Sequence, residues 1–144
     1  MKKIIHTKNA PSAIGPYNQA VLNDNILYTS GQIAIDPKNG TLKTREIREE
    51  TKQVMENLKA VLNEVGMNFT NVIKVTIFIS DMNNYSKINE IYASYFDEKS
   101  APARETVEVS RLPKDVNIEI SSIEFSVIFE KSNFLYSGKS KSRN

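Results

Sequence analysis

Arg104 has the clearest potential for chemistry in this chain of 144 residues. It follows the small residues Ala101–Ala103 at the start of an expected strand, where a long side chain can reach into a pocket. The planar guanidinium of arginine grips a carboxylate through two parallel hydrogen bonds. A surface ion pair with Glu105 or Glu108 is the plainer interpretation, because such pairs are common in proteins. The sequence leaves both interpretations open.

Glu119 is the second candidate for a chemical role. A hairpin turn at Leu112–Pro113 would place Glu119 opposite Thr106 on an adjacent antiparallel strand. Arg104 would then be its diagonal neighbour on the same face. This arrangement would bring together an anion clamp, a hydroxyl and a carboxylate, and the carboxylate could orient and deprotonate a water molecule. A charged residue on a solvent-facing strand explains Glu119 equally well.

Four further residues are candidates for the wall of a pocket, and each also has a purely structural interpretation. Ser30 and Gly31 end an apolar strand, where a hydroxyl and closely approaching backbone groups can line a site, or where the chain simply bends. Tyr17 can project its phenol into a site or pack with its hydroxyl bonded. Asn89 lies on an expected helix, where it also fits an exposed surface.

The composition excludes several classes of catalyst. The chain has no cysteine, so it offers no thiolate nucleophile, zinc–thiolate site or disulfide. His6 is the single histidine, which excludes a histidine-rich metal site and a Ser-His-Asp triad elsewhere in the chain. The five glycines never form a phosphate-binding loop. We therefore expect no metal and no cofactor.

The charge distribution separates a tail from the body of the chain. The formal net charge is +2, but residues 131–144 contain four basic residues and no acidic one. Residues 1–130 therefore carry a net charge of −2 and form the single expected domain, whereas the basic tail is expected to be disordered. An acidic body argues against a nucleic-acid partner, which needs a clustered basic face. No apolar run approaches the roughly 18 residues of a membrane span, so a soluble cytoplasmic protein is expected.

Hydrophobic periodicity predicts about six strands and two helices in residues 1–130. The expected elements are extended runs within Tyr17–Ser30 around a turn at 23–25, a run at Gln32–Ile35, a helix over Thr44–Val65, a strand over Val72–Ser80, a helix over Tyr85–Phe96, and strands over Arg104–Ser110 and Val116–Glu130. Thr44 is the expected N-cap of the first helix, and Gly66 suits the left-handed position after its last turn. The aromatic residues of the second helix are expected in the core.

The order β-β-β-α-β-α-β-β indicates an α+β domain, with a mostly antiparallel six-stranded sheet and both helices on one face. The other face is not expected to be fully solvated, because Phe78 shares it with Lys74 and Thr76. Apolar residues of the last strand change parity at Ser121–Ser122, which indicates either a β-bulge or a strand buried on both faces. We therefore expect the second face to contact a partner, and a closed symmetric homo-oligomer is the simplest one.

Several blocks of sequence resemble the Rid family, also called YjgF-like or L-PSP endoribonuclease-like proteins. The blocks are Ala10–Tyr17 (APSAIGPY), Thr29–Gln32 (TSGQ), Pro102–Arg104 (PAR), Val107–Val109 (VEV), Arg111–Val116 (RLPKDV) and Ile118–Ile120 (IEI). They occur in the family's order, and the resemblance runs from about residue 4 to residue 128. It implies a chorismate-mutase-like α+β fold, assembled as a barrel-like homotrimer with three sites between subunits.

The resemblance also implies an activity: cofactor-free hydrolysis of 2-imino acids, such as 2-iminobutanoate and 2-iminopropanoate, to 2-oxo acids and ammonia. Such a deaminase protects the cell against reactive metabolites. Arg104 would bind the substrate carboxylate, and Glu119 would position the attacking water and transfer protons. The pocket would be lined by Tyr17, Ser30, Gly31, Asn89 and Thr106, with Tyr17 a candidate contribution of the neighbouring chain. Thr106 stands where many members have cysteine, and alternation directs the negative charge of Glu105 away from Arg104.

Two other functions remain open. Members of the family are also described as single-strand endoribonucleases or translation inhibitors, a function that would need a basic groove with stacking aromatic residues. The −2 charge of residues 1–130 argues against it. A non-catalytic trimer that binds small 2-oxo acids would need Arg104 but not Glu119, so a Glu119→Gln protein separates this possibility from an enzyme.

Overall fold

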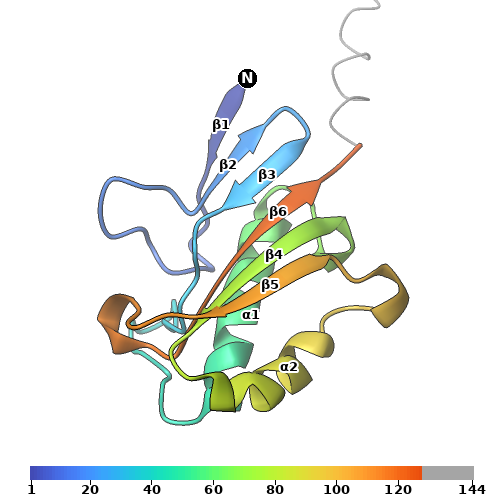
Figure 1. The fold of residues 1–144 in the computed structure, drawn as a ribbon. Coiled ribbons are helices and arrows are strands. Elements are labelled where there is room, and N and C mark those ends of the chain that lie inside the picture. Colours follow the sequence, from blue (N-terminus) through green and yellow to red (C-terminus); the bar gives the residue numbers. More distant parts are fainter. Residues whose placement is uncertain (128–144) are drawn as a thin grey trace, which may run out of the picture.

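Six strands and two α-helices form two layers in the described part of the chain, as a computed structural model shows (Figure 1). The structure describes residues 1–127, so the predicted tail at 131–144 lies outside the described residues. The strands form one sheet, and the two helices pack together on one face of it (Figure 1). This arrangement confirms the predicted α+β architecture.

The strands and helices follow the predicted order with one misplacement. The strands are β1 (Lys2–Ile5), β2 (Ala20–Asn23), β3 (Ile26–Thr29), β4 (Val72–Ile79), β5 (Ala103–Glu108) and β6 (Ile118–Phe125), and the helices are α1 (Ile47–Glu64) and α2 (Tyr85–Ala93). The prediction of a strand at Gln32–Ile35 is wrong, because Gln32 makes only an isolated antiparallel bridge to Ile120. The N-terminal strand missing from the prediction is β1, which is too short for its periodicity to be recognised.

The sheet has the order β1-β2-β3-β6-β4-β5, with β4 and β5 parallel and the other neighbours antiparallel. The predicted hairpin around Leu112–Pro113 is wrong, because β4 lies between the two strands that it was expected to join. The reason is the connection through α2, which carries the chain from the end of β4 back to the start of β5 and thereby makes these strands parallel. The connection 109–117 then brings β6 to the far side of β4 (Figure 1).

The two ends of α1 test the residues that were predicted to begin and end this helix. The predicted N-cap Thr44 is wrong, because the carboxylate of Glu46 accepts a hydrogen bond of 3.1 Å from the backbone N–H of Glu49 and the helix begins at Ile47. Gly66 has a φ of 71°, as predicted for the residue that follows the last turn.

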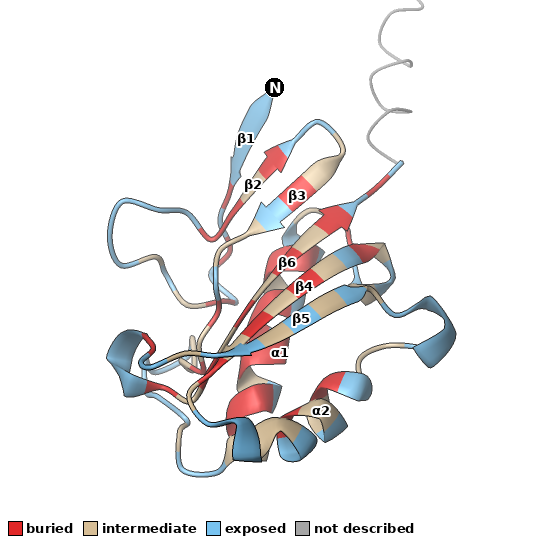
Figure 2. Cartoon of the chain, in the orientation of Figure 1, coloured by how far each residue is buried: buried red, intermediate tan, exposed pale blue. Residues whose placement is uncertain are grey.

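The core lies between α1 and the central strands β4 and β6 (Figure 2). Glu50 of α1 is buried in this core, and both oxygens of its carboxylate accept hydrogen bonds from Asn117. The bond from the backbone N–H is 2.7 Å long, and the bond from Nδ2 is 2.8 Å long. Asn117 immediately precedes β6. The Glu50–Asn117 link therefore ties α1 to the start of the strand that carries Glu119.

β6 keeps a single alternation along its whole length. Its helix-facing and buried residues are Ile118, Ile120, Ser122 and Glu124. The register shift between β4 and β6 lies on β4, between Val72 and Lys74. The apparent change of parity is therefore not a bulge in β6, because polar residues occupy the buried face there and the apolar Ile123 and Phe125 occupy the other face.

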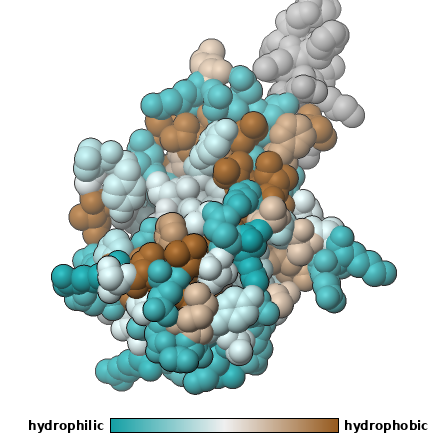
Figure 3. Space-filling model, in the orientation of Figure 1, coloured by the Kyte–Doolittle hydropathy of each residue, from teal (hydrophilic) through white to brown (hydrophobic). Residues whose placement is uncertain are grey.

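The face of the sheet opposite α1, here called the open face, carries large apolar side chains that the other described residues leave partly exposed. Tyr28, Val107 and Phe125 lie on it with exposed fractions of 45%, 42% and 42%. Figure 3 looks onto this side and shows apolar surface between polar side chains. A wet sheet face normally carries polar residues. This surface fits the predicted contact with a partner chain, which stays a prediction.

Glu124 has an unusual environment on the buried side of β6. Its side chain has an exposed fraction of 0%, and neither carboxylate oxygen has a hydrogen-bond partner among the described residues. Its neighbours across the sheet are the buried apolar residues Leu27 of β3 and Val72 of β4. Burial raises the pKa of Glu124 from its ordinary value of 4.5 to about 7, and the hydroxyl of Ser122 on the same face of β6 lowers it by less.

We expect this carboxyl to make the stability of the protein depend on pH. The folded state retains a proton that the unfolded chain releases, so the free energy of unfolding should decrease as pH rises from about 4.5 to about 7. The shift corresponds to about 3 kcal/mol. Glu124→Gln removes the ionisation and should flatten this dependence in denaturant unfolding at about pH 5 and about pH 8. The exposed Glu64→Gln is the matched control, and an unchanged pH dependence in Glu124→Gln would contradict the expectation.

Candidate active site

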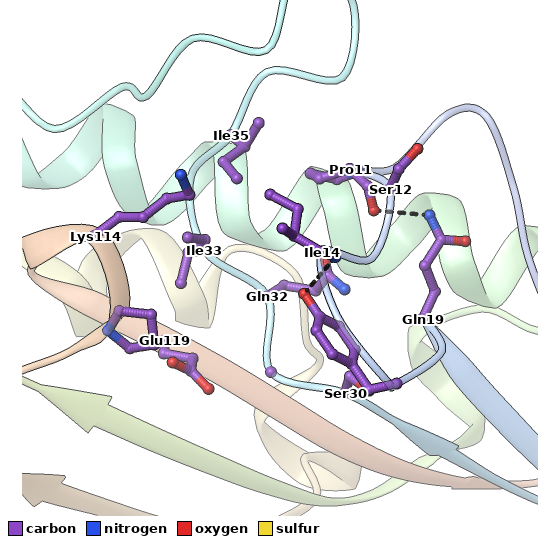
Figure 4. A pocket seen from close by; sticks show the side chains of 13 residues that line it. Pro11, Ser12, Ile14, Gln19, Ser30, Gln32, Ile33, Ile35, Lys114 and Glu119 are labelled. Atoms are coloured by element: carbon purple, nitrogen blue, oxygen red, sulfur yellow. Dashed lines mark hydrogen bonds between the residues drawn. The ribbon is translucent and has the colours of Figure 1, made fainter.

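A cavity of about 550 Å³ lies where the N-terminal loop and the segment after β3 pass the start of β6 (Figure 4). It is lined by Pro11, Ser12, Ile14, Tyr17, Gln19, Ser30, Gly31, Gln32, Ile33, Ile35, Pro113, Lys114 and Glu119. In Figure 4 the Glu119 and Lys114 side chains lie on one side of the cavity, across from Ile14 and Pro11. The cavity thus combines apolar wall surface with polar and charged side chains, as ligand sites do.

Glu119 points from the open face of β6 into this cavity. It lies opposite Phe78 of β4, and its side chain is half-buried. Burial raises the pKa of Glu119 above the ordinary value of 4.5. A carboxylate with a raised pKa in a cavity is a stronger proton acceptor than an exposed one, which suits a general base.

Gly31 allows this carboxyl to approach the backbone. A Cβ atom added to Gly31 would lie 2.7 Å from the carboxyl carbon of Glu119 and would overlap its Oε1. A side chain at position 31 would therefore displace the Glu119 carboxyl, which favours the close-approach interpretation of Gly31 over a simple bend.

Tyr17 and Ser30 line the cavity, but their hydroxyls have structural partners. The Tyr17 hydroxyl accepts a hydrogen bond of 3.2 Å from the backbone N–H of Ile14, and half of its side chain is exposed. The Ser30 hydroxyl donates one of 2.5 Å to the carbonyl of Asn18. These bonds fix the N-terminal loop over the cavity, so Ser30 contributes mainly to the shape of the wall.

Arg104 lies in a different cluster, on the helix-facing side of β5. Its Nη1 donates a hydrogen bond of 2.7 Å to Oδ1 of Asn89, and its Nη2 donates one of 2.6 Å to the hydroxyl of Tyr85. The guanidinium also lies over the ring of Tyr92, with its carbon 4.8 Å from the ring centroid. The side chain is thereby held by three residues of α2 in a half-buried position.

Two hydroxyls in this region lack partners. Those of Thr106 and Tyr92 are buried and have no hydrogen-bond partner among the described residues. Thr106 shares the face of β5 with Arg104, two residues away. Burial raises the pKa of the Tyr92 phenol to about 12, whereas the charge of Arg104 lowers it by less, so the phenol keeps its proton. Unpaired buried hydroxyls cost stability unless a ligand or water satisfies them.

Glu105 does not neutralise Arg104. Alternation directs it to the open face, where it pairs with Lys74 and accepts a hydrogen bond of 2.7 Å from the hydroxyl of Thr76. The hydrogen bond from Lys74, followed by that from Thr76, holds the pKa of Glu105 below its ordinary range. The expectation that Glu105 lies away from Arg104 is confirmed.

The predicted site residues thus fall into two groups. Tyr17, Ser30, Gly31 and Glu119 meet in the cavity, whereas Asn89, Arg104 and Thr106 meet beside α2. The prediction that Arg104 and Glu119 share a face within one chain is wrong. Arg104 pairs with Val75 on the buried face of β4, and Glu119 pairs with Phe78 on the open face. The physical reason is β4, which separates β5 from β6.

Tyr85 is the residue that sequence reasoning missed, because the aromatic residues of the second helix were all expected to be core. Tyr92 is buried as expected, but Tyr85 is only half-buried and bonds Arg104. Its spacing carried a signal. Tyr85, Asn89 and Tyr92 recur at four and three residues, which places them on one face of a helix.

The described part of the chain contains no cluster of metal-ligating side chains. Neither of its helices has the length and apolarity that a membrane span requires.

Known proteins similar to this chain match nearly all of the described residues. The family model for endoribonuclease L-PSP matches residues 7–124, a range that includes both groups of site residues. A RutC family protein of Pyrococcus horikoshii is 54% identical over 125 residues, covering 87% of this chain and 98% of the relative. The human 2-iminobutanoate/2-iminopropanoate deaminase is 44% identical over 123 residues, covering 85% and 89%. The crystal structure of E. coli TdcF with bound serine aligns with a TM-score of 0.81 at 42% identity, covering 86% and 98%.

Proposed function

This chain belongs to the endoribonuclease L-PSP family, also called the Rid family, and from that premise we propose that it hydrolyses 2-imino acids to 2-oxo acids and ammonia. The proposed substrates are 2-iminobutanoate and 2-iminopropanoate, which the name of the human relative specifies. The observation that carries the proposal is the Arg104 cluster, a half-buried guanidinium with no carboxylate partner among the described residues. Such a site is suited to a carboxylate that arrives with a ligand.

We place the complete site between two copies of the chain in a homotrimer. The carboxylate of a 2-imino acid is bonded directly to the carbon that water attacks, so Arg104 and Glu119 must approach the same small molecule. Within one chain they lie on opposite faces of the sheet, separated by β4. A neighbouring chain can supply the missing half, and the apolar open face offers the surface for such a contact.

In the proposed mechanism, Arg104 binds the substrate carboxylate and Glu119 activates water. The carboxylate of Glu119 takes a proton from a water molecule as its oxygen bonds to C2 of the protonated imine, whose π electrons move to nitrogen. The resulting aminoalcohol receives the proton from Glu119 on its nitrogen. The C–N bond then breaks, ammonia leaves, and the hydroxyl gives its proton back to the Glu119 carboxylate as the C=O bond of the 2-oxo acid forms. A protonated imine is already electrophilic, so the protein supplies mainly orientation and a proton relay.

The test of the function is a coupled assay. A dehydratase generates 2-iminobutanoate, and the formation of 2-oxobutanoate is followed with and without the purified chain. We expect a clear acceleration over spontaneous hydrolysis. Equal rates would contradict the deaminase and leave the binding of 2-oxo acids, measured by calorimetry, as the remaining function of the Arg104 cluster.

The alternative is a single-strand endoribonuclease, which the description of the matching family favours. Residues 1–130 carry a net charge of −2, whereas phosphate-backbone binding needs clustered basic residues. Cleavage of an RNA oligomer by a chain ending at residue 130, with loss of cleavage in Arg104→Ala, would support this alternative instead.

Gly31→Ala should reduce imine hydrolysis about 100-fold, because the added Cβ overlaps the carboxyl of Glu119 and moves it from its working position. The measurement is kcat in the coupled assay. Gly40→Ala is the matched control, because a Cβ there meets nothing within 4 Å. It should lower stability by about 1 kcal/mol through its positive φ and leave kcat unchanged. Native kcat in Gly31→Ala would show that the position of Glu119 does not matter.

A further inference from the structure

The Arg104 cluster offers more hydrogen-bond donors than its internal bonds use. Arginine has five N–H donors. Arg104 donates one hydrogen bond to Oδ1 of Asn89 and one to the hydroxyl of Tyr85. The Tyr85 oxygen is the acceptor in its bond of 2.6 Å, so its own proton is directed elsewhere and meets no acceptor among the described residues. The guanidinium and the phenol therefore present unused donors side by side.

The acidic residues of α2 and β5, the two elements that form this cluster, are all engaged with other groups. Glu90 of α2 accepts a hydrogen bond of 3.0 Å from Nε of Arg48 and forms an ion pair of 2.9 Å with Nη2 of the same residue. Glu105 pairs with Lys74 on the open face, and Glu108 accepts a hydrogen bond of 2.6 Å from the backbone N–H of Met82. The cluster is thus rich in donors and has no anion of its own in the described part of the chain.

We propose that Tyr85 is a substrate-binding residue, whose phenol donates a hydrogen bond to the same carboxylate that Arg104 binds. This inference rests on the proposed function and adds to it a third donor and a role for the start of α2. The phenol accepts from the guanidinium and donates to the ligand, so each of its bonds has a charged partner and is stronger than a neutral one. The ligand class is a small 2-imino or 2-oxo carboxylate.

The geometry distinguishes this role from simple packing. The ring of Tyr85 lies 5.6 Å from the guanidinium carbon, so a phenylalanine would keep the ring contact and lose only the hydroxyl. The carboxylate carries the same charge in the substrate and in the transition state of imine hydrolysis. A hydrogen bond to it therefore stabilises both states equally and should affect binding rather than kcat.

The test compares Tyr85→Phe with the native protein, Tyr95→Phe and Arg104→Ala, each as the full chain. Calorimetry measures the Kd of 2-oxobutanoate, and the coupled assay measures kcat and KM. Tyr95→Phe is the matched control, because its hydroxyl bonds Glu56 at 2.9 Å, away from Arg104. We expect Tyr85→Phe to raise Kd and KM about tenfold and to change kcat less than about twofold, with Tyr95→Phe unchanged.

The outcomes separate this inference from the proposed function. A Kd in Tyr85→Phe equal to that of the native protein, together with weak binding in Arg104→Ala, overturns the role of Tyr85 alone. An equal loss in Tyr95→Phe also overturns it, because the effect would then come from the packing of α2. Native affinity in Arg104→Ala overturns the proposed function, and the inference with it.

Discussion

Arg104→Ala should reduce the hydrolysis of 2-iminobutanoate to the spontaneous rate. The substitution removes the positive charge and the hydrogen bonds to the substrate carboxylate, each of which contributes roughly 1.5–3 kcal/mol when one partner is charged. We therefore expect kcat/KM to fall at least about 100-fold. The substitution also removes the hydrogen bonds that Arg104 donates to Asn89 and Tyr85, so these two side chains are no longer held in position.

Two further variants make this result interpretable. Arg104→Lys keeps the charge but cannot form the planar two-bond grip, and should retain a small part of the activity. Arg48→Ala is the matched control, because Arg48 bonds Glu90 of α2, the helix that also carries Tyr85 and Asn89, but does not belong to the Arg104 cluster. It should leave kcat/KM unchanged. Full activity in Arg104→Ala, with the folded state verified by thermal unfolding, would remove Arg104 from its proposed role.

Glu119→Gln should lower kcat about 100-fold or more while substrate binding persists, because the amide cannot accept the proton of the attacking water. The measurement is kcat from the coupled assay together with the Kd of 2-oxobutanoate. Glu124→Gln is the matched control, since Glu124 lies on the same strand but faces the opposite side of the sheet. Native kcat in Glu119→Gln would contradict the role of this carboxylate as the base.

The activity of the native protein should also report the environment of Glu119. The ionised carboxylate is the active form, and burial raises its pKa above 4.5. The rate should therefore fall as pH decreases through that raised pKa, and the fall should begin at a higher pH than for an exposed glutamate. Glu119→Gln should lose this acidic limb of the profile.

Mixed assemblies of the two variants test whether Arg104 and Glu119 act from different chains. Arg104→Ala and Glu119→Gln chains, co-expressed with different tags and purified through both, form trimers in which one of the three sites receives both native residues. We expect these mixed trimers to recover about one third of the native activity, although each variant alone is inactive. No recovery would place both residues in the site of one chain and contradict the shared site.

The sequence by itself determined the α+β class and the order of the elements, because these depend on local periodicity and on short-range signals. The apolar stripe of α1 and Gly66 after its end are of this kind. It also predicted Arg104 and Glu119 as site residues, because both lie in blocks that resemble the Rid family. Capping was less predictable, because the competing acceptors Thr44 and Glu46 are two residues apart and only packing selects between them.

Only the tertiary structure decided which of these residues meet. A predicted hairpin brought Arg104 and Glu119 to one face, but strand pairing is a long-range choice, and the crossover through α2 made β5 an edge strand beside β4. The same packing turned Tyr85 toward Arg104 and brought Gly31 against Glu119, contacts between segments far apart in the chain. Local periodicity assigns a side chain to a face of its own element, whereas the neighbour on that face depends on how distant elements pair.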